Sequence, residues 1–212
     1  MGDMELKGLA PMRVAAVILA AVLFLSACGS GGDYSPKPRG YFRIDLPEKE
    51  YRPYKSQYPF TFDYPVYAQL EQNSTPARTI LQNMQYKLNM QFKQLNATLH
   101  LSYQPVTSKK IFNELIEDAH KLAFKHTVKA TGIDEARINY PDRKVYGLYY
   151  TIDGNAASAV QFYLTDSVHH YLRGALYFNE SPQFDSIQPV LNFVKKDVDV
   201  LIKTLRWKWN TL

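Results

Sequence analysis

The segment from residue 145 to residue 178 constrains the fold of this chain more than any other. It contains three apolar runs separated by short turns of Asp, Gly, Asn and Ser, and such turns between apolar runs are typical of β-hairpins. The runs are Val145–Ile152, Ala156–Thr165 and His169–Phe178. We therefore predict three antiparallel strands in a meander, with the first turn at 153–155.

Side chains alternate in character along the second and third runs. One face is apolar and carries Ser158, Val160, Phe162, Leu164, Leu172, Gly174, Leu176 and Phe178. The other face carries Gln161 and Thr165 together with five residues that we select as candidate partner-binding residues: Tyr163, His169, Tyr171, Arg173 and Tyr177. The apolar face must pack on a helix. The polar face either recognises a partner or simply faces water, as one side of many antiparallel sheets does.

Two segments have the three-and-four spacing of apolar residues that predicts amphipathic helices. The first follows Ser108, a good N-cap, and the second runs from Ile187 to about Leu205 and is expected to cover the apolar sheet face. Four further strands are predicted, namely 84–92, 97–103, 128–133 and 135–140, whereas 71–78 is predicted to be a polar connection.

Tyrosine and proline dominate residues 41–67, which are therefore expected to form edge strands or an extended arm wrapped over the domain. The tyrosines of this arm either pack on the body or form an aromatic strip for a carbohydrate or a protein partner. We predict a single α+β domain over 41–212, an antiparallel sheet of about five or six strands covered by two main helices. An α-β-α arrangement resembling PsbP is one form that it could take.

The first 27 residues resemble a cleaved signal peptide, with Lys7 and Arg13 before an apolar run too short to span a bilayer as a helix. The sequence Leu25-Ser-Ala-Cys28 resembles a bacterial lipobox and contains the only cysteine of the chain. This resemblance implies cleavage before Cys28 and its acylation by fatty chains such as palmitate; the alternative is an ordinary signal peptide with a coincidental cysteine. Residues 28–40, rich in Gly, Ser and Pro, are expected to form a flexible tether.

The net charge and the sequence motifs limit the functions that this chain can have. Removing the leader takes two of 25 basic and two of 20 acidic residues, so the mature chain keeps a net charge of +5. This value suits a protein close to anionic lipid or polysaccharide, and we expect no nucleic-acid partner. No phosphate loop, Gly-x-Ser-x-Gly or His-Glu-x-x-His motif is present, so we predict no enzyme, no metal and no cofactor. Ser167 and Ser186 each follow an Asp, as in a short O-glycosylation motif, although turn and cap roles explain them equally well.

Eight short motifs follow one another along the chain: Pro36-Lys-Pro-Arg-Gly-Tyr-Phe-Arg, His100-Leu-Ser-Tyr, Asp118-Ala-His-Lys, Lys125-His-Thr-Val-Lys-Ala, Val145-Tyr-Gly, Gln161-Phe-Tyr-Leu-Thr-Asp-Ser, Arg173-Gly-Ala-Leu-Tyr-Phe and Phe184-Asp-Ser-Ile-Gln-Pro. Together and in this order they resemble the gliding motility lipoprotein GldD family. The resemblance implies a cell-envelope lipoprotein needed for gliding and linked to the type IX secretion machinery. It supplies no catalytic residues.

Two hypotheses follow. The favoured one is a non-enzymatic component or assembly factor of the gliding and type IX secretion machinery, held to a membrane through lipid on Cys28 and facing the periplasm. The alternative is an envelope glycan- or ligand-binding protein, or a hydrolase, that uses the polar sheet face. A deep pocket gathering Tyr163, Tyr171, Arg173 and His169 with His126 would favour the alternative.

Overall fold

A computed structural model of the chain describes residues 44–55, 58–73, 86–179 and 184–208. The predicted leader, Cys28 and the tether to Gly40 lie outside these residues. The described residues all belong to one compact unit that begins at Arg43.

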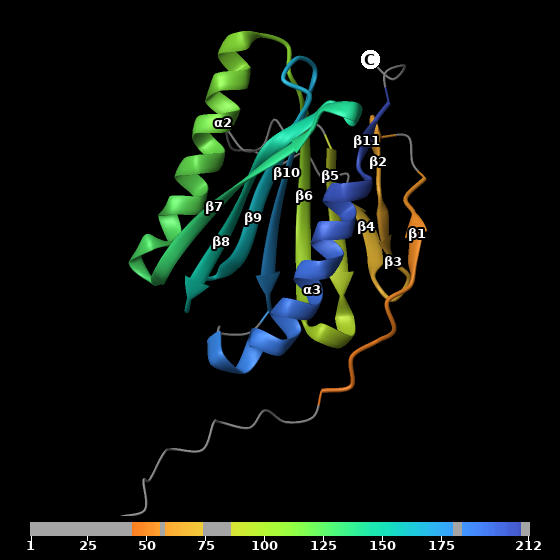
Figure 1. Ribbon diagram of the computed structural model, residues 1–212, viewed down its shortest axis with the longest axis vertical. Coiled ribbons are helices and arrows are strands. Elements are labelled where there is room, and N and C mark those ends of the chain that lie inside the picture. The colour runs from red at the N-terminus through yellow and green to blue at the C-terminus, as the bar shows by residue number, and fades with distance from the viewer. Residues whose placement is uncertain (1–43, 56–57, 74–85, 180–183, 209–212) are drawn as a thin grey trace, which may run out of the picture. The chain divides into compact units, whose positions relative to one another are not determined.

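A seven-stranded antiparallel sheet forms the centre of this unit (Figure 1). In spatial order its strands are β4 (Gln69–Asn73), β5 (Tyr86–Phe92), β6 (Ala97–Pro105), β10 (His170–Phe178), β9 (Ser158–Thr165), β8 (Val145–Gly154) and β7 (Ala130–Tyr140). The predicted antiparallel α+β architecture with two helices is confirmed. Three details of the prediction are wrong. The sheet has seven strands instead of about five or six, β7 is one strand instead of two, and β4 occupies part of the expected polar connection.

The predicted meander is formed by β8, β9 and β10, which pair in consecutive order. Gly154 closes β8 at a φ of +90°, a conformation that glycine adopts without a steric penalty. The alternation of side chains is also confirmed, because the apolar set, with Phe162 and Leu172 near its middle, lies in the main hydrophobic core.

The last helix, α3 (Phe184–Thr204), covers the apolar face as expected (Figure 1). It buries one apolar stripe, which ends just beyond the helix and consists of Leu191, Val194, Val198, Leu201, Ile202 and Leu205. The N-terminal arm extends this core with aromatic side chains; for example, the rings of Tyr54 and Phe62 stack with centroids 5.0 Å apart. The arm therefore packs on the body, as one of the two interpretations predicted.

Short strands hold the arm in place. β1 (Tyr51–Pro53) pairs with β3 (Asp63–Pro65), and β2 (Phe60–Thr61) pairs with β11 (Arg206–Trp207). This second pairing joins the arm to the chain just after α3, where the side chain of Trp207 is buried at the edge of the core.

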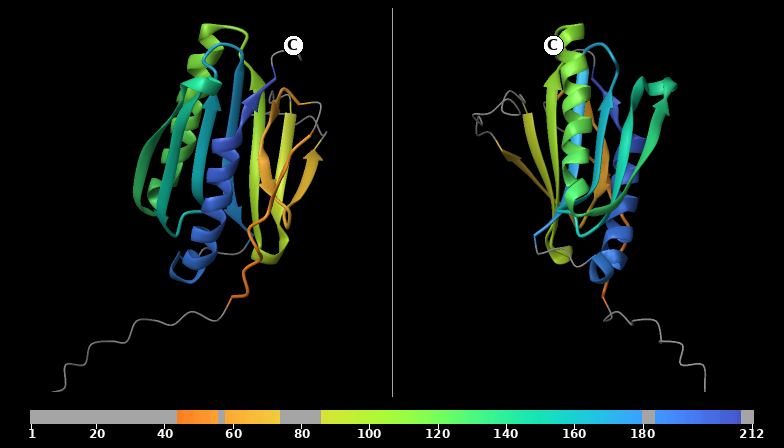
Figure 2. Two further views of the ribbon diagram at one scale, coloured as in Figure 1. Left: turned by 45° about the vertical axis from the view of Figure 1, so that its right-hand side comes forward. Right: turned by 90° about the vertical axis from the view of Figure 1, so that its left-hand side faces the viewer.

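The first helix, α2 (Lys109–Phe124), packs on the opposite face of the sheet from α3 (Figure 2). The side chain of Ser108 accepts a hydrogen bond from the backbone N–H of Ile111, which confirms the predicted N-cap. Three short 3-10 turns complete the described elements, namely η3 (Lys93–Leu95), η4 (Lys125–Val128) and η5 (Pro141–Arg143). The resemblance to PsbP remains a prediction.

Candidate partner-binding surface

Helix α2 covers the middle of the sheet face that we expected to be open. Tyr163 and Tyr171 are 7% and 1% exposed, and their rings stack 5.8 Å apart beneath the helix. The Tyr171 hydroxyl donates a 3.1 Å hydrogen bond to the carbonyl of Leu115 in α2. Burial raises the pKa of Tyr171, and it raises the pKa of neighbouring Tyr150 to about 12. The expectation of a water-facing position is therefore wrong for Tyr163 and Tyr171, because amphipathic tyrosines can pack under a helix while their hydroxyls find partners.

The other three candidate residues lie at separate places along β10 and the turn before it. Arg173 is half-buried and donates a 2.5 Å hydrogen bond to Gln161. His169 is exposed at the β9–β10 turn, whereas Tyr177 is partly exposed near the far end of the strand. The structure thus does not gather the five predicted residues into one site.

A part of the polar face does remain open, over β4, β5, β6 and the end of β10. We call this the open polar face and define it by Glu71, Asn89, Gln91, His100 and Tyr177, which are exposed or partly exposed. Two cross-strand pairs organise it: Asn89 Oδ1 lies 2.7 Å from His100 Nδ1, and the Gln91 amide donates to Glu71 at 2.5 Å. The rings of His100 and Tyr177 meet edge to face at 5.6 Å.

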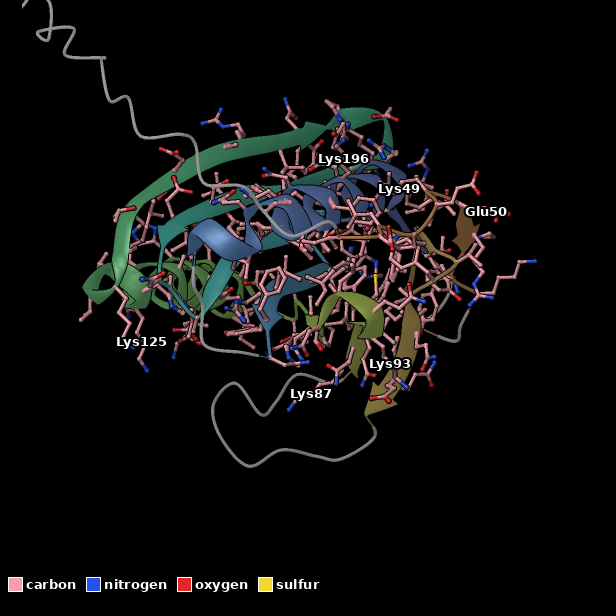
Figure 3. All side chains as sticks on the ribbon, turned by 90° about the horizontal axis from the view of Figure 1, so that it is seen from below. Lys49, Glu50, Lys87, Lys93, Lys125 and Lys196 are labelled. Atoms are coloured by element: carbon pink, nitrogen blue, oxygen red, sulfur yellow. The ribbon has the colours of Figure 1, made fainter. Side chains whose placement is uncertain are left out.

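Basic side chains lie on both sides of the sheet. Viewed from below, Lys87 and Lys125 lie on the side of α2, whereas Lys49 and Lys196 lie on the side of α3 (Figure 3). Lys87 sits opposite Ser102 of β6 and therefore borders the open polar face. This surface thus combines amide, carboxylate, imidazole and phenol groups with an adjacent ammonium, so it can both donate and accept hydrogen bonds.

An open hollow of about 420 Å³ lies over β7, β8 and β9, away from the open polar face. Its lining consists of Arg137, Ile138, Asn139, Tyr146, Gly147, Leu148 and Tyr163. It therefore includes one predicted residue but none of Tyr171, Arg173, His169 and His126, so it is not the pocket that would favour the alternative hypothesis.

The polar residues of the β9–β10 turn hold the backbone. Asp166 is buried, and its Oδ1 accepts hydrogen bonds from the backbone N–H groups of residues 168, 169 and 170 at 2.7–3.0 Å. Ser167 is exposed and adopts a φ of +70°, in the left-handed region. Asp166 thus has the role of a turn residue. Ser167 is accessible to modification, whereas the side chain of Ser186 lies outside the described residues.

A buried polar cluster that the sequence analysis missed joins the arm to α3. Asp197 is 1% exposed and accepts hydrogen bonds from Lys49 Nζ at 2.6 Å, from the Tyr51 hydroxyl at 2.8 Å and from the Tyr67 hydroxyl. Lys49 Nζ also lies 3.4 Å from the centre of the Phe193 ring. We call Lys49, Tyr51, Tyr67 and Asp197 the arm cluster. The available signal was an aspartate within the apolar stripe of α3, where a buried charge needs a partner.

Burial shifts the pKa values of the arm cluster. Desolvation lowers the pKa of Lys49, against the opposing effect of Asp197. Desolvation, together with the Asp197 carboxylate, raises the pKa values of Tyr51 and Tyr67. The cluster therefore favours protonated tyrosines that donate to one carboxylate, an arrangement that fixes the arm on α3.

The described residues contain neither a cluster of metal ligands nor a helix suited to cross a membrane. In that part of the chain, no three His, Cys, Asp or Glu side chains converge as metal ligands. Within the same ranges, neither α2 nor α3 combines the length and the apolar character that a membrane crossing requires.

The fold and this surface define an α+β domain with one helix on each face of an antiparallel sheet and an open polar face beside α2. The chain belongs to the gliding motility lipoprotein GldD family, whose pattern it matches over residues 31–207. The predicted family is thereby confirmed, and with it a membrane-anchored lipoprotein of the cell envelope with a link to gliding motility. A comparison with curated proteins finds no match.

Proposed function

We propose that this protein is a non-enzymatic component or assembly factor of the gliding motility and type IX secretion machinery. In this proposal, lipid on Cys28 holds the protein to a membrane, its domain faces the periplasm, and its open polar face binds another protein of the machinery. The observation that carries the proposal is the family match over 31–207, a range that contains nearly the whole described domain.

The anchor is tested by the substitution Cys28→Ala. We expect this variant to leave the membrane fraction and to lose the gliding or secretion phenotype, because no other thiol is available for acylation. Ser30→Ala, two residues further along, is the control and should behave as the parent protein. A Cys28→Ala protein that still fractionates with membranes and still supports the phenotype would contradict the proposal.

Docking is tested on the open polar face with His100→Ala and Tyr177→Ala. Both side chains reach solvent, so we expect little change in the melting temperature and a loss of partner proteins recovered by crosslinking in intact envelopes. Glu117→Ala, on the exposed side of α2, serves as the control. Unchanged recovery from both variants would show that this face does not bind the partner. Tyr171 is unsuitable for this test, because its truncation would leave a cavity under α2.

Glycan binding is a second candidate that one observation favours. The open polar face presents an amide–imidazole pair and an amide–carboxylate pair beside the Tyr177 ring, and sugars are bound by such planar polar groups next to an aromatic ring. Soluble peptidoglycan fragments binding to the full-length protein, with loss of binding in Tyr177→Ala, would support this candidate. No binding by the parent protein would exclude peptidoglycan as its ligand.

A further inference from the structure

Strand β7 forms one edge of the seven-stranded sheet, and most of its residues are exposed. It has 11 residues, and its inner side pairs with β8 along nearly its whole length. On its outer side, no strand among the described residues pairs with it. Seven of its 11 residues are exposed, including Asp134, Glu135, Ala136 and Arg137. Edge strands of this length present a row of backbone donors and acceptors that can pair with another strand.

The charges near the middle of β7 are self-complementary. Glu135 and Arg137 lie opposite Tyr150 and Leu148 of β8, so both project from the sheet face that carries α2. If two β7 strands pair antiparallel about a two-fold axis at Ala136, each Glu135 lies opposite Arg137 of the other copy. Two cross-strand pairs of opposite charge then lie on the same face, where each Glu135 also lies 3.6 Å from Nδ1 of His120 in its own α2.

Neighbouring symmetric registers are disfavoured. A two-fold axis at residue 135 places Glu135 of one copy opposite Glu135 of the other. An axis at residue 137 does the same with Arg137. Like charges directly opposite one another destabilise a strand pair. The sequence of β7 therefore favours the register centred on Ala136. Moving the axis by one residue in either direction removes the attraction between Glu135 and Arg137 and places two like charges opposite each other.

The ends of β7 agree with the same register. Gly132 would lie opposite Tyr140 of the other copy, and a side chain added at Gly132 would meet nothing within 4 Å. An aromatic ring can cover such a bare glycine from the neighbouring strand.

The predicted anchor leaves room for this arrangement. Residues 28–43 join Cys28 to the described domain and, at roughly 3.4 Å each, can span at most about 55 Å. This length exceeds the extent of an 11-residue strand, which is about 37 Å. Two lipid-anchored copies can therefore meet in antiparallel orientation.

We propose that two copies of this chain form a dimer through antiparallel pairing of their β7 strands in the register centred on Ala136. The dimer joins two seven-stranded sheets into one continuous sheet. This inference goes beyond the proposed function and uses none of the residues of the open polar face, so the two can fail independently.

Crosslinking in intact envelopes tests the dimer with the full-length protein. In Ala136→Cys the two new cysteines face each other with Cα atoms about 4.5–5.5 Å apart, within the range of about 4.4–6.8 Å that a disulfide spans. In the matched control Asp134→Cys, the two cysteines are four residues out of step, roughly 13 Å apart, and cannot bridge. We expect a reducible dimer from Ala136→Cys and none from Asp134→Cys. Equal crosslinking of both, no dimer from Ala136→Cys, or its attachment to a different protein would overturn the proposal.

A charge exchange in the Ala136→Cys background tests the register. Glu135→Arg or Arg137→Glu alone places like charges opposite one another and should lower the dimer yield several-fold. The two changes together restore opposite charges and should restore the yield. A double variant that crosslinks no better than the single variants would show that these charges do not face each other.

Discussion

At the residue scale, Asp197 stands out because it is charged and yet buried in the stripe of α3 that faces the core. Lys49 supplies the opposite charge from the arm, 148 positions earlier in the chain. The local sequence around neither residue predicts this pairing, because Asp197 interrupts an apolar pattern and Lys49 lies among other charged residues of the arm. The two residues stabilise the fold only because folding brings them into contact.

Replacing Asp197 by Asn should destabilise the protein. The change keeps the shape of the side chain but leaves the Lys49 ammonium, with its side chain 25% exposed, without its counter-ion, so we expect a loss of about 3 kcal/mol in the free energy of unfolding. The measurement is urea denaturation. Glu114→Gln is the matched control, since it breaks the exposed 3.9 Å pair with Lys110 and should cost no more than about 0.5 kcal/mol. Equal losses in the two variants would contradict a structural role for the arm cluster.

At the element scale, strands in which apolar and polar side chains alternate were predictable, whereas strands without this alternation were not. The alternation in β9 and β10 predicted both strands and the apolar face that packs on α3. In contrast, β4 has the polar sequence Gln-Leu-Glu-Gln-Asn and becomes a strand through its pairing with β5. Propensity is weak for such short edge strands, because backbone pairing with a neighbour decides their conformation.

Two glycines allow a matched test of strand packing. A Cβ at Gly147 of β8 would lie 1.8 Å from the carbonyl oxygen of Tyr163 in β9, so Gly147→Ala must push the two strands apart. We expect a loss of about 3 kcal/mol in the free energy of unfolding. At Gly132 of β7 the same change meets nothing within 4 Å, so Gly132→Ala should be neutral or stabilising by about 0.5 kcal/mol. Thermal denaturation of both variants measures the difference, and similar melting temperatures would be inconsistent with the close approach of β8 and β9.

At the scale of the whole molecule, burial of tyrosines predicts alkaline instability. Burial is the largest cause of a raised pKa for Tyr51, Tyr67, Tyr149, Tyr150, Tyr163 and Tyr171. In the unfolded chain these phenols ionise near pH 10, before they ionise in the folded protein. Their contribution to stability is therefore complete below about pH 10 and is lost as the pH rises through the folded-state pKa values.

The free energy of unfolding should thus fall between about pH 10 and about pH 12, by at most about 1.4 kcal/mol per pH unit for each such tyrosine. Lys49 acts in the opposite direction, because its lowered pKa makes its contribution rise with pH up to its ordinary value near 10.5. One lysine does not offset six tyrosines. Urea denaturation at a series of pH values measures the effect, and constant stability across this range would contradict the burial of these hydroxyls.

On the candidate surface, the sequence determines which face of the sheet a residue lies on, and the tertiary structure determines whether that residue is accessible. The period-two pattern correctly placed Tyr163, Tyr171 and Tyr177 on one face of the sheet, because neighbouring side chains of a strand point to opposite sides. It contained no information on where α2 crosses that face. The helix buries Tyr163 and Tyr171 and leaves Tyr177 accessible, so accessibility along β10 depends on packing between distant segments.

The sequence by itself determined the family, the antiparallel meander, the two amphipathic helices and the apolar face under α3. These features depend on local periodicity and on motifs of a few residues, which can be recognised without knowledge of the fold. Only the tertiary structure decided the path of α2, the arm cluster around Asp197 and the position of β7 at the edge of the described sheet. Each of these depends on contacts between segments far apart in the chain, and such contacts exist only after the core has formed.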